Sequence, residues 1–140
     1  MIETMQEVCR SIDWIIHNAK HGFFLIVANE SQQKELRSKY ESAPVFVYDW
    51  EGKTEAFQLS HIPDLITRKI GERTIFFFDF QNAIRDVYGA RNLNFLRDAI
   101  FRTETNIIFV VTPEGYDRLN TEAMDVIHFM NLSFFLCELD

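Results

Sequence analysis

Cysteine, proline and glycine are all scarce in this chain, with two, three and five copies among 140 residues. Cys9 and Cys137 lie near opposite ends of the sequence in apolar surroundings, which favours two free buried thiols over a disulfide and predicts a reducing, cytoplasmic setting. The first residues lack the basic and then apolar pattern of a signal peptide, and no apolar run reaches the ~18 residues of a membrane-spanning helix. The sequence therefore predicts a cytoplasmic protein without a membrane partner.

Positive charge is scarce as well. Asp and Glu number 21 against 14 Lys and Arg, which gives a net charge of −7. A protein of this charge is repelled by a polyphosphate backbone and gains nothing from counterion release. We expect no nucleic-acid partner.

Phenylalanine, by contrast, is abundant, with 14 copies concentrated in short apolar runs. Unbroken runs of this length are typical of strands that are covered on both faces of a parallel sheet. Between the runs, apolar residues recur at steps of three and four, as they do on amphipathic helices, first over residues 2–20. The predicted strands are 23–28, 45–48, 74–78, 107–111 and 132–136, and later helical stretches cover 62–70, 83–102 and 116–130.

This alternation predicts an α/β fold, namely a three-layer open parallel sheet of about five strands with helices on both faces. No linker, low-complexity tract or repeat divides the chain, so we expect residues 1–140 to form a single domain, the N-terminal domain of a longer protein. Asn29 is expected to cap the helix after the first strand, with Gln32 completing a capping box and with Leu36 and Tyr40 facing inward.

Sheets of this class bind ligands beyond the carboxyl ends of their strands, so the residues after the first strand are informative. A P-loop, Gly-x-x-x-x-Gly-Lys-Ser/Thr, curls backbone amides around phosphate and holds magnesium through its hydroxyl. In residues 28–35, Lys34 falls on the lysine position, but Ala28 and Gln33 replace the glycines and Glu35 replaces the hydroxyl. Glu30 and Glu35 also add negative charge, and like charges ~4 Å apart cost about 4 kcal/mol at an effective dielectric constant near 20. Conventional triphosphate binding is expected to fail.

The third predicted strand ends in Asp79, the position at which a Walker B strand holds magnesium through water. The next residue, where many ATPases carry an acid that activates water, is Phe80. Asp79 has two other interpretations: it caps the following helix, or it hydrogen-bonds across the strand ends.

The pattern resembles the degenerate P-loop domains of STAND-type signalling ATPases, particularly bacterial ones that precede tetratricopeptide or similar repeats. The resemblance spans nearly the whole chain through loose apolar patterns, which are the first strand (22–27), the run 33–36, the stretch 92–98, and the segment from Ile107 to Leu136. It implies a domain that uses nucleotide as a switch for assembly. The departures at the glycines, the hydroxyl and the acid predict that this chain is not an enzyme and holds no cofactor.

The leading hypothesis is therefore a non-catalytic regulatory or protein-interaction domain of a signalling protein, which binds a protein partner or adjacent domains of the same chain. An exposed Trp14 or Ile2 on the first helix is a candidate docking residue. One alternative is a nucleotide-binding switch without efficient hydrolysis, using the remnant positions Lys34 and Asp79.

The second alternative is a receiver-like phospho-acceptor domain with Asp79 as the acceptor, because Thr112 and the acidic position after the first strand also fit that scheme. The lysine expected at the end of the fifth strand is absent. Receiver and P-loop strand orders give the same alternation, so the sequence leaves both open.

Two further groups of residues have simpler explanations than a site. His17 and His21 are spaced to share a metal ion but lack a third ligand, so we expect them at a solvated helix end. Arg91, Arg97 and Arg102 are interspersed with acids and predict a mixed, solvated face rather than a basic patch.

Overall fold

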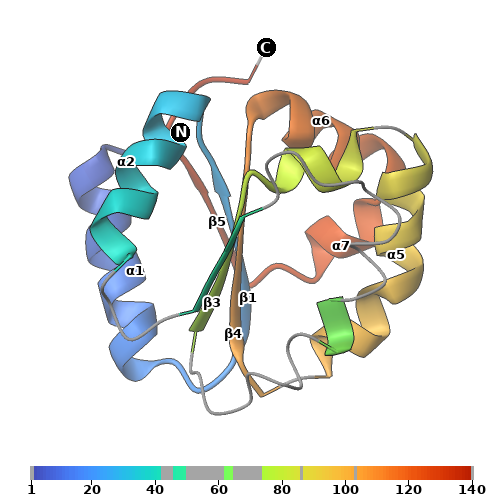
Figure 1. Ribbon diagram of the computed structural model, residues 1–140, viewed down its shortest axis with the longest axis horizontal. Helices are drawn as coiled ribbons and strands as arrows, with labels where there is room; N and C mark the ends of the chain where they lie inside the picture. Colours follow the sequence, from blue (N-terminus) through green and yellow to red (C-terminus); the bar gives the residue numbers. More distant parts are fainter. Residues whose placement is uncertain are drawn as a thin grey trace.

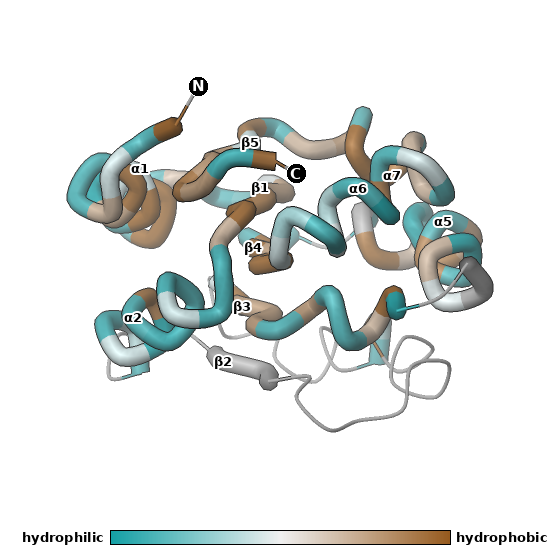
Figure 2. The backbone as a smooth tube through the Cα atoms, turned by 90° about the horizontal axis from the view of Figure 1, so that it is seen from above, coloured by the Kyte–Doolittle hydropathy of each residue, from teal (hydrophilic) through white to brown (hydrophobic). Residues whose placement is uncertain are grey.

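A single sheet organises the molecule. The computed structural model describes residues 2–41, 46–49, 62–64, 74–85, 87–102 and 104–139. The described strands are all parallel and lie in the order β2-β3-β4-β1-β5 (Figure 2). Their bounds are β1 (Gly22–Val27), β2 (Phe46–Asp49), β3 (Thr74–Phe78), β4 (Asn106–Val111) and β5 (Leu132–Phe135).

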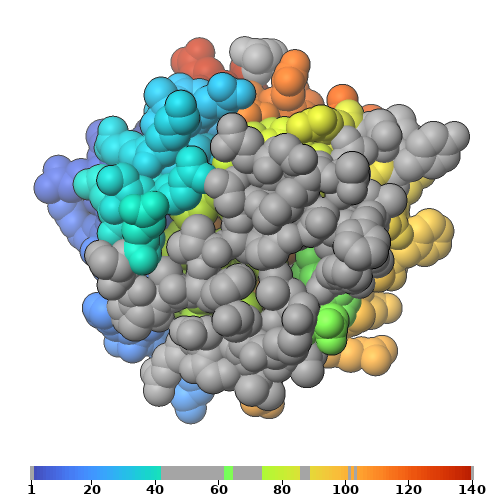
Figure 3. Space-filling model, in the orientation of Figure 1, coloured from blue at the N-terminus to red at the C-terminus, as the bar shows by residue number. Residues whose placement is uncertain are grey.

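Helices cover both faces of this sheet, which confirms the predicted α/β class (Figure 1). One layer contains α1 (Met5–Asn18) and α2 (Glu30–Tyr40). The opposite layer contains the 3₁₀ helix η1 (Phe80–Ile84), α5 (Val87–Phe101), α6 (Pro113–Glu122) and α7 (Met124–His128). In the space-filling view, the side chains of α2 and of α5 lie at opposite borders of the molecule (Figure 3). Among the described residues, none of the helices combines the length and apolarity needed to cross a membrane.

The sheet separates two apolar cores because successive side chains of a strand point to opposite faces. In β3, Phe76 and Phe78 pack toward α1 and α2, and their rings stack with centroids 5.3 Å apart. Phe77 points to the other core, where it stacks on Phe109 at 5.5 Å. The abundance of phenylalanine thus supplies both cores.

Capping fixes the starts of the two helices that cover the first core. Thr4 and Glu7 form a capping box, so α1 starts at Met5. The prediction placed the start of this helix three residues earlier, at residue 2. Asn29 and Gln32 form the predicted capping box of α2, and the prediction is confirmed. Leu36 and Tyr40 are buried, as predicted.

The remaining boundaries shift slightly from their predictions. Ala28 lies outside β1, and β4 begins one residue early at Asn106. Asn106 is fully buried, and its amide nitrogen donates to the carbonyls of Ile15 and Ala19 at the end of α1, which offsets part of the cost of burying it. The stretch 83–102 divides between η1 and α5. Of the predicted helix 62–70, only residues 62–64 belong to the described residues, and they are helical.

The strand order contradicts the receiver-like alternative. Receivers have the order 2-1-3-4-5, in which the first strand lies between the second and third. Here β1 pairs with β4 along one edge and with β5 along the other. Both of its edges are therefore occupied, which leaves no place for β2 or β3 beside it.

Close packing at one glycine generates a prediction. A Cβ atom at Gly115 in α6 would lie 2.8 Å from Cβ of Gln81 and 3.2 Å from Cβ of Val111. Alanine favours helices over glycine by about 1 kcal/mol, but overpacking costs about 1–3 kcal/mol. We expect Gly115→Ala to lower the free energy of unfolding in urea, whereas Asn120→Ala, an exposed change on the same helix, leaves it nearly unchanged. A Gly115→Ala protein as stable as the parent would show that α6 does not approach Gln81 this closely.

Candidate functional site

The helices that follow β1 and β4 leave the sheet on opposite sides. The chain runs from β1 into α2 on one face, and from the neighbouring β4 into α6 on the other (Figure 1). In open α/β sheets, ligands bind in the crevice that such a divergence creates at the carboxyl ends of the strands. The candidate site therefore lies beyond the ends of β1, β3 and β4.

The connection from β1 to α2 is too short to wrap a phosphate. Only Ala28 and Asn29 separate the strand from the helix, so residues 30–35 of the expected loop are helical. The Asn29 side chain accepts the backbone N–H of Gln32 at 2.9 Å. The helix start is thus capped by its own chain, and most of the stretch compared with a P-loop is helical.

Gln33 occupies the space between the ends of β1 and β3. Its side chain is buried, and its amide nitrogen donates to the carbonyl of Ala28 at 3.2 Å and to Oε1 of Gln81 at 3.1 Å. Its amide oxygen accepts the backbone N–H of Asp79 at 2.9 Å. A buried amide is tolerated only when it is hydrogen-bonded in this way. We call these contacts of Gln33, Asp79 and Gln81 the Gln33 bridge.

Asp79 is held by the same surroundings. Its backbone is left-handed, with φ 54° and ψ 34°, a conformation that aspartate tolerates better than most residues. Its carboxylate accepts from the Gln81 amide at 3.4 Å and lies 3.7 Å from the Arg37 guanidinium. The side chain makes no capping hydrogen bond to η1, because it faces α2 and Gln81. The cap interpretation is wrong. The carboxylate accepts from Gln81, two residues along the chain, and pairs with Arg37 on α2, so a hydrogen bond of this side chain across the strand ends stays a prediction.

The two remnant positions have different surroundings. Lys34 is exposed on α2, one residue beyond the buried Gln33, whereas Asp79 is partly buried directly after β3. Arg37, which the sequence did not single out, reaches Asp79 instead. It lies one helical turn after Gln33 on the face that also buries Leu36, and that spacing is the signal that would have identified it. A nucleotide-binding role for Lys34 and Asp79 stays a prediction.

The other candidate residues have structural surroundings. Phe80, at the position of the catalytic acid, is fully buried with its ring centroid 4.5 Å from that of Phe109. Cys9 and Cys137 are free but only partly buried, rather than fully buried as expected, and burial raises the pKa of the Cys9 thiol.

The remaining histidine and arginine candidates are exposed or paired with acids. His17 and His21 are exposed, and the described part of the chain contains no cluster of three metal-ligating side chains. Arg91 pairs with Glu122 at 3.1 Å and Arg97 with Asp125 at 3.8 Å, which fits the mixed face predicted for the arginines.

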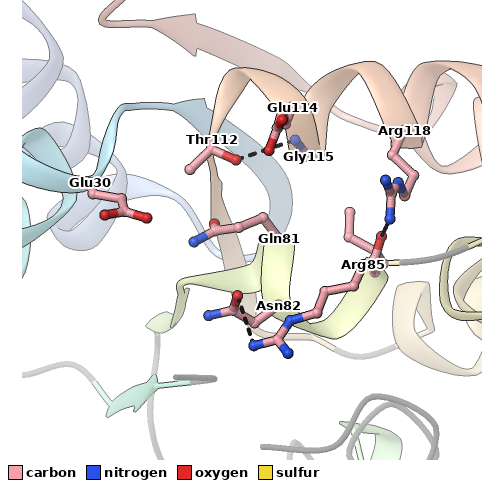
Figure 4. Close-up of a pocket in the computed structure, with 9 residues that line it drawn as sticks. Glu30, Gln81, Asn82, Arg85, Thr112, Glu114, Gly115 and Arg118 are labelled. Carbon is pink, nitrogen blue, oxygen red and sulfur yellow. Dashed lines mark hydrogen bonds between the residues drawn. The ribbon is translucent and has the colours of Figure 1, made fainter. Parts of the chain in front are cut away.

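Beside the Gln33 bridge, the crevice opens into a polar pocket of about 290 Å³, which we call the strand-end pocket (Figure 4). Thr112 caps α6 there by accepting the Gly115 N–H at 3.3 Å. Glu30 lies on one side, at the start of α2, and two arginines lie on the other. The pocket is lined by Glu30, Gln81, Asn82, Ile84, Arg85, Thr112, Glu114, Gly115 and Arg118.

No protein-family model matches the chain, and no curated protein matches it.

The Gln33 bridge predicts a pH-dependent variant. Gln33→Glu removes the amide donor and places a carboxylate against two oxygen acceptors and near Asp79. Burial and these neighbours should raise the pKa of the new carboxyl above its unfolded value. The native state then binds a proton that the unfolded chain releases, so stability falls as pH rises above about 4. We expect a loss of about 3 kcal/mol at neutral pH and a smaller loss in acid.

The measurement is urea unfolding of the variant and the parent across this pH range, with Gln6→Glu as the matched change at an exposed position. A Gln33→Glu protein whose stability relative to the parent does not vary with pH would contradict the observed environment of Gln33.

Proposed function

We propose that this chain is a non-catalytic regulatory or protein-interaction domain of a cytoplasmic signalling protein, with the architecture of a P-loop ATPase and no working phosphate site. The observation that carries the proposal is the buried side chain of Gln33, which fills the space between β1 and β3 with three hydrogen bonds. A phosphate in that space would have to displace a satisfied buried amide.

The strand order supports the architectural part of the proposal. β1 lies between β4 and β5, an order that the receiver-like alternative does not allow and that is compatible with the proposed P-loop-like architecture. The position of Asp79 at the end of β3, adjacent to β4, also suits a Walker B strand in that order.

The chemistry of the strand ends supports the absence of catalysis. Hydrolysis needs a group that orients water and donors or metal ions that stabilise the transferred phosphoryl group. Phe80 supplies only an apolar ring, and Glu35, at the position of the magnesium-binding hydroxyl, is an exposed helical residue. Arg37 neutralises Asp79 from within the chain.

We expect the surface of the domain to bind a protein partner or an adjacent domain of the same chain. Trp14 on α1 is 63% exposed and Ile2 is 49% exposed. Tryptophan is among the residues that contribute most to protein interfaces when a partner buries it. The face of α1 that carries Trp14 is therefore the first region to test.

The proposal predicts no response to nucleotide. Millimolar ATP with magnesium should leave the melting temperature unchanged, because a ligand stabilises only a fold that binds it. Phosphate release from ATP should equal that of a buffer blank. Both measurements use the intact chain by thermal shift and by a phosphate-release assay.

A melting temperature that rises with Mg-ATP, and that no longer rises in Lys34→Gln and Asp79→Asn, would contradict the proposal and support the residual nucleotide switch. Ser38→Ala, an exposed change on α2, serves as the control that should retain the behaviour of the parent.

A further inference from the structure

The strand β5 forms one edge of the sheet and lies at the border of the molecule (Figure 2). Its inner edge pairs with β1, where the Leu136 N–H donates to the carbonyl of Val27 at 2.9 Å. The Phe135 carbonyl faces the other way and accepts the Glu3 N–H at 2.8 Å. Because successive residues of a strand direct their main-chain groups to alternate edges, Ser133 also faces outward. Among the described residues, none pairs with the outward N–H and C=O of Ser133.

The segment that contains this edge carries no fixed charge. None of the residues 126–137 is Asp, Glu, Lys or Arg, although 25% of the chain is charged and the net charge is −7. Edge strands of soluble proteins usually carry lysine, other charged side chains or proline, which prevent pairing with another chain. β5 has none of these, so its outward main-chain groups remain open to a second strand.

Apolar side chains are exposed before, within and after the same strand. Leu132 in β5 is 54% exposed, and Phe129, three residues before the strand, is half exposed. After the strand, Cys137 and Leu139 line an apolar pocket of about 590 Å³ together with Ile2. Of the seven large apolar side chains that are exposed in the described part of the chain, four belong to this region (Ile2, Phe129, Leu132 and Leu139). A partner strand therefore finds apolar surface on both sides of the hydrogen-bonding edge.

We propose that the outer edge of β5 binds β5 of a second copy of this chain, antiparallel to it, about a two-fold axis at Ser133. The two Ser133 residues then exchange both main-chain hydrogen bonds, and the two sheets become continuous. A two-fold axis brings the same surface of both copies together, so any charge close to it meets a like charge. The absence of charge from residues 126–137 removes this repulsion, and it favours a second copy over a partner that is recognised through charge.

The same register matches the apolar side chains. Leu132 lies diagonally across from its counterpart in the second copy, on the same face of the joined sheet and within reach of it. Because the strands are antiparallel, the segment of one copy that carries Phe129 runs toward the segment of the other that lines the apolar pocket with Cys137 and Leu139. The bond from Glu3 to Phe135 limits the ladder to the middle of the strand, so these apolar contacts supply most of the affinity.

The experiment is gel filtration of the intact chain with light scattering, over loading concentrations from about 1 μM to about 200 μM. We expect the mass to rise from that of one chain to that of two. Leu132→Lys puts two like charges near the axis, and Ser133→Pro removes an outward N–H without touching the pairing with β1. Each change should weaken association about tenfold or more. Phe95→Lys, an exposed apolar-to-lysine change on α5, is the matched control and should dimerise as the parent does.

Amide hydrogen exchange in the parent chain distinguishes this interface from any other. The Ser133 amide should exchange more slowly at the highest concentration than at the lowest, because only the dimer hydrogen-bonds it. The proposal is overturned if the chain stays single at all these concentrations, if both β5 variants dimerise as the parent does, or if exchange at Ser133 does not depend on concentration. None of these results bears on docking through Trp14, which lies on α1 and is tested separately.

Discussion

The complete burial of β1 is the constraint on which the rest of the structure depends. All six of its residues are buried, and its two edges pair with β4 and β5. A strand enclosed in this way must be apolar throughout, and it needs a helical layer on each face. The chain can leave the sheet only at the two ends of this strand. At the carboxyl end, α2 departs to one face while α6, which follows β4, departs to the other, and this divergence creates the crevice.

The buried side chain of Gln33 fills part of that crevice. Gln33 lies where the buried face of α2 meets the strand ends, so its amide must find partners or lose about 1–3 kcal/mol for each unpaired group. Ala28, Gln81 and Asp79 supply them. Gln33, which stands at the position compared with the second glycine of a P-loop, is therefore a structural link between α2 and the end of β3.

The sequence predicts the parts of this arrangement that depend on local patterns. Apolar runs identify β1, β3 and β4, and the spacing of Asn29 and Gln32 identifies the start of α2. In the Gln33 bridge, Gln33 contacts Asp79 and Gln81, which lie 46 and 48 positions further along the chain. No local pattern in the sequence reveals contacts over such separations. The left-handed backbone of Asp79 and its pairing with Arg37 depend on the same distant contacts. The strand order is hidden for a related reason, since alternation of strands and helices does not specify which strands are neighbours.

Gln81 connects the two regions of the crevice. Its side chain accepts from Gln33 and donates to Asp79, and the same residue lines the strand-end pocket. A displacement of Gln81 would disturb its hydrogen bond with Gln33 on α2 and its hydrogen bond with Asp79, the residue after β3. The other end of α2 is tied to α1, where the Tyr40 hydroxyl contacts Asp13 and the carbonyl of Cys9. A continuous set of contacts thus runs from the pocket to the helix that exposes Trp14. Contiguity alone is not coupling, but these contacts join the crevice to the helix that carries the proposed docking residue Trp14.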